Sequence, residues 1–315
     1  MTGSVHEFGR YADVRDALAN PDLVPPPALP GPPGSMAWLR ATVARFSSGE
    51  AHGRRRALVE ADLSRLDPAA LRAAAASASG SGGDARLLVV RTLAEGLGID
   101  DPDAVARAVS LLAGRYLVAA DRQPGAVSEA EAEAEADAAV AWLLPRMLPM
   151  DPTGYPALLE AAASRIGLLV QACDATGGLV DRARRAAAGC PAVHTTERMT
   201  AALLTETLRY DPPVRSTRRF AVRRTRIAWT AIAKGDQVVL DLAAANRDAG
   251  FFTDPDSFDP GRSGPAHLTF GSGPRPCPGR AHALALATGI LDRSQAPAQA
   301  PTQAPVQAPA TEEAR

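Results

Sequence analysis

The stretch FGSGPRPCPG, residues 270–279, carries the main clue to the fold of this chain. Three glycines and three prolines in ten residues predict a loop rather than a helix or strand interior. The residues that follow, RAHALALATGILDR, predict a helix, so Cys277 lies on a loop just before a helix N-terminus. Unpaired N–H groups and the positive end of the helix dipole should lower the pKa of a thiol there. Cys277 is either a metal ligand or a buried structural cysteine, the usual role of a lone cysteine.

The composition places few limits on function but excludes several classes. A chain of 315 residues can form one large domain or two. The net charge of −1 offers no overall attraction to nucleic acid or to an anionic membrane. The three cysteines are far apart and odd in number, which argues against a disulfide framework. Short apolar runs and the absence of a signal peptide favour a soluble, cytoplasmic protein that uses no membrane.

The apolar spacing along the chain is mostly helical. Helices are predicted over residues 11–20, 51–63, 85–98, 165–187 and 195–211. A helix that begins near Ser128, with Glu131 completing a capping box, would have a solvated acidic face. Strand signals gather only in residues 218–242, and residues 22–48 are interpreted as a proline-rich loop. The four QAP repeats near the C-terminus cannot form a core, so we expect one domain over residues 1–293 and a disordered tail over 294–315.

A second group of charged residues accompanies the cysteine loop. Glu206 and Arg209 lie one helical turn apart, close enough to pair, and FDPGR places Arg262 on a nearby loop. With these residues in place, the chain resembles the cytochromes P-450, the heme-thiolate oxidoreductases. The family pattern F-G-x-G-x-R-x-C-x-G is matched by Phe270, Gly271, Gly273, Arg275, Cys277 and Gly279. The E-x-x-R pair and the third member of that triad are matched by Glu206, Arg209 and Arg262, and the resemblance covers residues 195–293.

This resemblance implies a mainly α cytochrome P-450 fold with a small β region and a shortened N-terminus. It implies heme b, with Cys277 as the axial ligand of the iron, and a structural role for the Glu206, Arg209 and Arg262 triad. A thiolate ligand donates electron density that favours O–O cleavage. Phe270 would shield the sulfur from water, and Gly271 and Gly273 would let backbone amides approach it. The heme propionates need cationic partners, and the residues at the matching positions are His52, Arg56, Arg219, His267 and Arg275.

The chain departs from the family at the helix expected on the distal side of the heme. The family pattern there is A-G-x-[DE]-T, and an ungapped match to QACDA retains the acid as Asp174 but places Ala175 where the threonine should be. Thr176 comes one residue late, about 100° around the helix, and could serve only if the helix is locally widened. Asp174 and Thr176 are therefore the distal candidates, with atypical chemistry expected. Cys173 and Cys190 are interpreted as apolar fillers, and Cys190 with His194 is weak support for zinc.

The expected activity is oxidation of a small organic molecule, as a tailoring step in specialised-metabolite biosynthesis. The resemblance implies electrons from a ferredoxin and its reductase, then dioxygen binding and O–O cleavage. The altered distal helix allows coupling, nitrogen oxidation, use of peroxide or a redox-neutral rearrangement. A degenerate relative that activates a partner enzyme is the alternative, but such a protein would not need Cys277. A heme sensor or carrier is a weaker third interpretation, since no signalling module is recognised.

Overall fold

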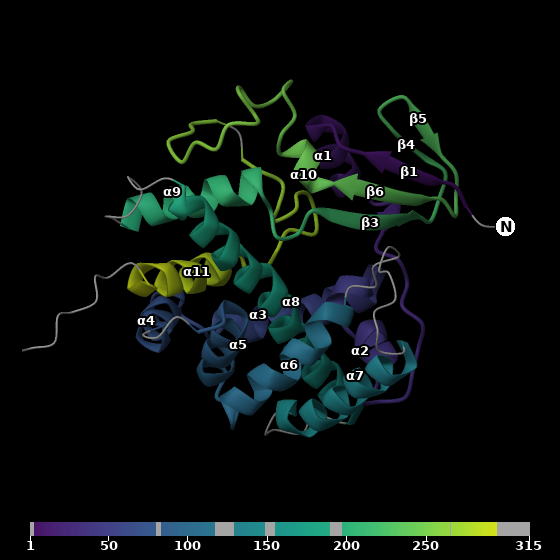
Figure 1. Ribbon diagram of the computed structural model, residues 1–315. Helices are drawn as coiled ribbons and strands as arrows, with labels where there is room; N and C mark the ends of the chain where they lie inside the picture. Colours follow the sequence, from purple (N-terminus) through teal and green to yellow (C-terminus); the bar gives the residue numbers. More distant parts are fainter. Residues whose placement is uncertain are drawn as a thin grey trace, which may run out of the picture.

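The computed structural model describes residues 3–79, 83–116, 129–148, 155–189, 197–264 and 266–294. A large body of helices adjoins a small region of strands (Figure 1). The helices up to the middle of the chain are α1 (Tyr11–Ala19), α2 (Met36–Thr42), α3 (Gly49–Ser64), α4 (Pro68–Ala78), α5 (Ala85–Gly96), α6 (Pro102–Tyr116) and α7 (Glu129–Leu143). The later ones are α8 (Tyr155–Ala188), α9 (Glu197–Tyr210), α10 (Leu242–Ala245) and α11 (Arg280–Ser294), and two 3₁₀ turns are η1 (Ala44–Phe46) and η2 (Leu144–Met147).

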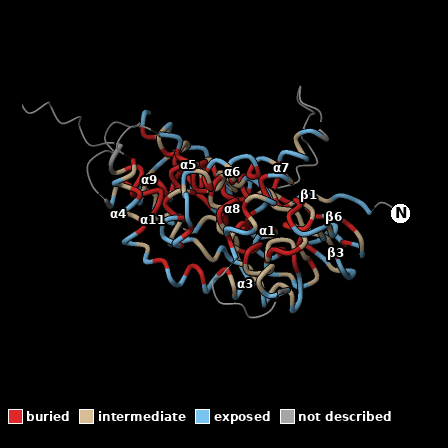
Figure 2. Tube along the Cα trace, turned by 90° about the horizontal axis from the view of Figure 1, so that it is seen from below, coloured by how far each residue is buried: buried red, intermediate tan, exposed pale blue. Residues whose placement is uncertain are grey.

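Helix α8 is the axis of the helical body. It spans 34 residues without interruption, and α3, α5, α6, α9 and α11 all pack against it. Figure 2 shows the buried part of the trace concentrated where α5, α6 and α8 meet. The approach of α5 is close at Gly177, where a Cβ atom would lie 2.6 Å from Cγ of Arg86. Gly177 therefore serves helix packing, and α8 is a regular α-helix at the position where a local widening was considered.

The strands form a four-stranded sheet and a separate hairpin. The sheet has the order β1 (Val5–Phe8), β6 (Gln237–Asp241), β3 (Ser216–Ala221) and β2 (Leu23–Val24). Strand β1 runs parallel to β6, whereas β3 is antiparallel to both β6 and β2. Strands β4 (Thr225–Ile227) and β5 (Thr230–Ile232) make the hairpin. A second apolar core, which includes Val14, Leu18, Val238, Leu240 and Phe252, joins the sheet to α1 and to the chain that follows α10.

The mainly helical fold and the strand region are confirmed, with one correction. Residues 22–48 are not a continuous loop, because α2 and η1 form within them. The side chain of Ser35 caps α2 by accepting a hydrogen bond from the Trp38 N–H at 3.1 Å, and Leu39 is fully buried. Because Ser35 caps its N-terminus and Leu39 is buried, a helix forms directly after the proline-rich part of this stretch. The capping box at Ser128, Cys190 with His194, and the tail after Ser294 fall outside the described residues.

Candidate functional site

The loop that carries Cys277 is shaped by two glycines and a pair of backbone hydrogen bonds. The N–H of Gly271 donates to the Leu268 carbonyl, and the N–H of Cys277 donates to the Phe270 carbonyl, both at 2.8 Å. Gly271 and Gly273 have φ angles of +76° and +70°, in the left-handed region that favours glycine. A Cβ atom on Gly273 would lie 2.8 Å from the Cα atom of Ala19, so the loop rests directly on α1.

Cys277 is a free, accessible thiol, yet its pKa lies above the usual value because the surrounding protein partly excludes water. A backbone hydrogen bond from Gly279 and the charges of Arg56, Arg45 and Arg280 act in the opposite direction without reversing the shift. The expectation that the helix N-terminus lowers this pKa is therefore wrong for the unliganded thiol, because desolvation outweighs the dipole. A bound metal ion deprotonates a coordinating thiol outright, and the nearby cations would then stabilise the thiolate.

Three arginines from distant parts of the chain gather near the cysteine. Arg45 follows α2, Arg219 lies on β3 opposite Val238, and Arg275 precedes Cys277 by two residues. Burial lowers the pKa of Arg219 to about 10, and repulsion from Arg45 and Arg275 contributes to the shift. Burial also lowers the pKa of Arg45, while Tyr116 and Cys277 counteract it. We call Arg45, Arg219 and Arg275 the arginine cluster.

The arginine cluster is the best indication of what the site binds. Within the part of the chain that the structure describes, no carboxylate contributes to the pKa shift of Arg45, Arg219 or Arg275. Partly buried cations that repel one another need an anionic partner. Two carboxylates on a ligand would satisfy this need, and the adjacent free thiol could bind a metal that the same ligand carries. The residues present therefore fit a heme with its propionates.

His52 and Arg56 lie beside this cluster but differ in their roles. His52 is close enough to Arg275 and Arg56 that their charges, after burial, lower its pKa. Arg56 pairs with Glu60 at 2.6 Å and donates to the Pro276 carbonyl at 2.7 Å. In this arrangement Arg56 fastens the cysteine loop to α3, while Arg275 is fixed by donating to the Ser47 carbonyl at 2.8 Å. Arg56 thus supports the loop and also acts on the Cys277 thiol, and its role as a propionate partner stays a prediction.

His267 is not placed with the proposed propionate ligands. Its ring centroid lies 5.7 Å from that of Phe270, and the charges that act on it belong to Arg280 and Glu206. Burial is the main reason that its pKa falls to about 4. A largely neutral imidazole packed beside the triad is a poor partner for an anion. The expectation that His267 contacts a propionate stays a prediction, which its lowered pKa does not favour.

Glu206, Arg209 and Arg262 come together as one buried network. The guanidinium of Arg209 donates to both carboxylate oxygens of Glu206, at 2.7 and 2.9 Å, and Nε of Arg262 lies 3.3 Å from the carboxylate. Arg209 also donates to the carbonyls of Asn246, Pro255 and Ser257, and Arg262 to those of Thr253, Asp254 and Ser257. The network holds the segment before the cysteine loop against α9.

Asp174 and Thr176 lie on α8, and their described contacts are with α5 and the core. Asp174 is half-exposed and pairs with Arg86 of α5, with Oδ1 and Nε 3.4 Å apart. Thr176 is only 3% exposed and is followed by a run of buried residues. Asp174 therefore contacts α5 and Thr176 lies in the core, and a distal role for either residue stays a prediction. Cys173 is buried as expected, which raises its pKa to about 12.

Sequence reasoning missed Arg45 and Tyr116. Arg45 stands within ATVARFSS, a stretch without a recognisable pattern, and was included in the expected loop. Tyr116 ends α6, and its ring lies 5.5 Å from that of Phe46. Only the fold shows that Arg45 lies near both Tyr116 and Cys277. An arginine beside an aromatic residue just before the HGRRR stretch was the available signal.

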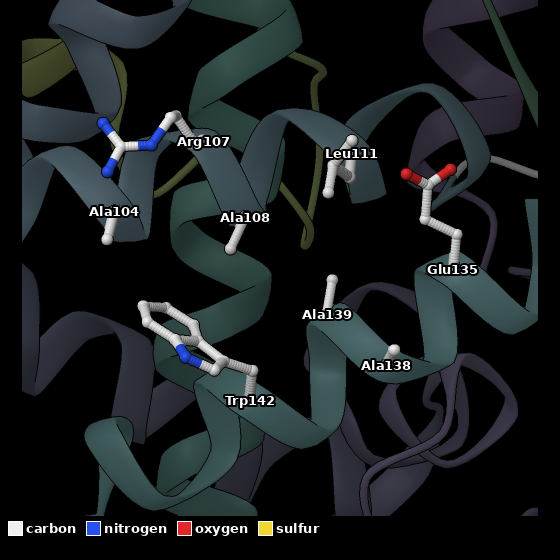
Figure 3. A pocket seen from close by; sticks show the side chains of 8 residues that line it. All are labelled: Ala104, Arg107, Ala108, Leu111, Glu135, Ala138, Ala139 and Trp142. Carbon is white, nitrogen blue, oxygen red and sulfur yellow. The ribbon is translucent and has the colours of Figure 1, made fainter.

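The surface groove in Figure 3 is a different feature. It measures about 300 Å³ and lies between α6 and α7. Its lining is mostly apolar and consists of Ala104, Arg107, Ala108, Leu111, Glu135, Ala138, Ala139 and Trp142. None of these residues belongs to the cysteine loop or the arginine cluster. The groove therefore provides no information about the candidate site.

Comparison with known proteins explains the site. Residues 183–288 match the family model described as cytochrome P450. This part of the chain is similar to the cytochrome P450 family. Linalool 8-monooxygenase of Pseudomonas putida is 49% identical over 74 residues, which make up 24% of this chain and 18% of that protein. The biotin biosynthesis cytochrome P450 of Bacillus subtilis is 47% identical over 74 residues, 24% of this chain and 19% of its own length. The matched segments thus span about a fifth of these relatives.

Solved structures extend the likeness in fold to most of the chain. CYP164A2 of Mycobacterium smegmatis, in its ligand-free state, aligns with a TM-score of 0.72 and 25% identity over 93% of this chain and 83% of its own. CalO2 aligns with a TM-score of 0.74 and 24% identity over 91% of this chain and 82% of its own. The cytochrome P450 fold is therefore present in the helical body as well as around the cysteine loop. No helix among the described residues is long and apolar enough to cross a membrane.

Proposed function

We propose that this protein is a heme-thiolate monooxygenase that oxidises a small organic molecule. The observation that supports the proposal most directly is the arginine cluster next to a free thiol, Cys277. Three cations without a described carboxylate suit the two propionates, and the thiol suits the iron. The similarity to the cytochrome P450 family supports the same cofactor. Heme b, rather than a covalently attached heme, is the expected form.

Each residue around the cysteine has a defined task in this proposal. Arg45, Arg219 and Arg275 bind the propionates and orient the heme plane. Cys277 supplies the thiolate, and the N–H of Gly279 donates to its sulfur. Phe270 covers the loop on the side of His267 and Arg280, which limits water at the sulfur. When bound, the heme supplies the redox centre at which dioxygen is activated.

We further propose a ferredoxin and its reductase as electron donors and a tailoring role in specialised-metabolite biosynthesis. Arg280 is exposed three residues after Cys277, which gives an acidic electron carrier a cationic contact near the heme. Ala175 stands where the family has its threonine, and the retained acid, Asp174, pairs with Arg86 of α5. This supports atypical chemistry, such as coupling, nitrogen oxidation, peroxide use or rearrangement.

The proposal is tested by spectroscopy of the purified holoprotein. Reduced protein under carbon monoxide should show the red-shifted Soret band of thiolate ligation, and Cys277→Ser should abolish it. Arg45→Ala should weaken heme binding by about tenfold or more, because a charge-assisted contact is lost. Arg65→Ala, at a residue whose side chain is 64% exposed, is the matched control and should leave binding unchanged. A heme-replete protein with a histidine-type spectrum would refute the assignment of Cys277.

The alternative, a protein that activates a partner enzyme without chemistry, predicts a different result. Such a protein would form no product from any substrate tested, whether it is supplied with dioxygen and a reductant or with peroxide. Product formation that requires Cys277 would exclude this alternative. Comparing dioxygen with peroxide in the same panel also separates ordinary monooxygenation from the atypical outcomes.

A further inference from the structure

One face of α8 is less buried than the rest of the helix. Leu168, Gln171, Ala172 and Ala175 are partly buried, whereas the intervening Leu169, Val170 and Cys173 are at most 1% exposed. Spacings of three, four and seven residues place the first group along one side of a helix. Leu168 and Ala172 still pack against the apolar core, so this side of the central helix is only partly open. Gln171 is the polar member of this stripe.

The stripe begins beside residues that belong to the cysteine site. Gly167 approaches the chain before η1 so closely that a Cβ atom would lie 2.9 Å from Cγ1 of Val43 and 3.3 Å from Oη of Tyr116. Val43 precedes Arg45 by two residues, and the pKa of Arg45 responds to both Tyr116 and Cys277. The turn of α8 at Gly167 therefore lies on the side of the helix body that faces the site.

The side chain of Gln171 is oriented within this turn. Its Nε2 atom donates to the Gly167 carbonyl at 2.9 Å. A glutamine amide has two N–H donors and an acceptor oxygen, so this bond uses only part of its capacity. The contact also fixes the amide close to the face of Gly167 that Tyr116 approaches. Gln171 is thus held in place and still able to bind a small polar molecule.

Tyr116 provides an independent observation. Its hydroxyl is buried and has no hydrogen-bond partner among the described residues. A buried polar group without a partner costs about 1–3 kcal/mol and calls for an explanation such as a water molecule or a ligand. This hydroxyl would be 3.3 Å from a Cβ atom on Gly167, the residue whose carbonyl Gln171 contacts. Two polar groups with unused capacity therefore flank the same turn of α8.

We propose that Gln171 and Tyr116 are the distal polar residues of this protein and hold a water molecule on the α8 side of the heme, in place of Asp174 and Thr176. The inference rests on the proposed heme-thiolate function. Thr176 follows Gln171 by five residues, about 140° around the helix, which explains why the two cannot serve the same space. An amide does not ionise near neutral pH, so Gln171 would position water and pass no proton of its own. The Tyr116 hydroxyl would donate to or accept from the same water.

The test compares three conservative variants as ferric and as reduced, carbon monoxide-bound holoproteins. Gln171→Leu keeps the size of the side chain, Tyr116→Phe removes one oxygen atom, and Thr176→Val is the matched control. We expect the first two to shift the C–O stretching frequency in the infrared and to raise the high-spin fraction of the ferric heme, because ordered water is lost. Thr176→Val should change neither quantity. Heme content and melting temperature are measured for each variant, and Tyr116→Phe remains informative if Gln171→Leu retains little heme.

One result would overturn this inference, and a different result would refute the proposed function. A shift in Thr176→Val with none in Gln171→Leu and Tyr116→Phe would overturn the inference and restore the distal role of Thr176. In that case the thiolate Soret band of the unmodified protein would still support the proposed function. Absence of that band from the unmodified holoprotein would instead refute the proposed function itself, so the two failures are distinguishable.

Discussion

Replacing Glu206 by alanine should destabilise the protein severely. Glu206 is 4% exposed, and its carboxylate accepts from the side chains of Arg209 and Arg262 and from the N–H of Asp259 at 2.9 Å. Arg209 cannot swing into solvent, because it is 2% exposed and bonded to three backbone carbonyls. Removing one partner of such a buried pair costs about 3–5 kcal/mol. A typical domain has about 5–15 kcal/mol of stability in total, so little holoprotein should survive at 37 °C.

The assay is urea unfolding followed by circular dichroism. With an m-value of about 3 kcal/mol/M, the midpoint should fall by about 1–2 M. Asp16→Ala is the control, because the Arg15–Asp16 pair is about half-exposed or more on both sides and should contribute no more than about 1 kcal/mol. If Glu206→Ala shifts the free energy of unfolding no more than Asp16→Ala does, the network is not the buried, mutually dependent unit described above.

Three further predictions concern other parts of the chain. Gly273→Ala should destabilise the protein by about 1–3 kcal/mol through backbone strain, and by a further amount because the new Cβ atom clashes with Ala19. Gly98 also has a φ of +70° but has open space around it, so Gly98→Ala should show the strain alone in the same urea assay. Burial lowers the pKa of His267 from 6.5 to about 4, so as the pH falls the unfolded chain binds this proton before the folded protein does. The free energy of unfolding should therefore decrease between about pH 6.5 and pH 4. His267→Gln should make the urea midpoint less dependent on pH in this range. Deleting residues 294–315 should leave the melting temperature and heme content unchanged, since the QAP repeats offer no apolar face, and a large fall in either would mean that the tail docks on the domain.

Local patterns and the family resemblance were enough to predict the cysteine loop and the charged pair on α9. The glycines and prolines around Cys277 specify a turn with little help from the rest of the fold. Glu206 and Arg209 are one helical turn apart, so their pairing needs only the helix. The mainly helical architecture followed from the same kind of periodicity.

The remaining parts of the site depend on contacts between distant segments. Arg45 has no local signal, and its place beside Cys277 comes from the packing of the chain before α3. The sequence does not decide the distal residues, because periodicity gives the angle between side chains and not which face of α8 turns to the site. Gly177 was interpreted as a point where the helix could widen, but the neighbouring Arg86 backbone explains the glycine by close packing. Each error concerns a tertiary contact that no stretch of sequence encodes alone.

The order of strands in the sheet has a consequence for synthesis on the ribosome. Strands β1 and β2 pair with β6 and β3, and both partners are encoded more than 190 residues later. At about 5–20 residues per second, the first strands must wait roughly 10–45 s for the residues that pair with them. The helices from α2 to α9 emerge in that interval and can collapse first. Arg219 and Cys277 join Arg45 only after this closure, so the cysteine site cannot form until the chain has been made at least as far as Cys277.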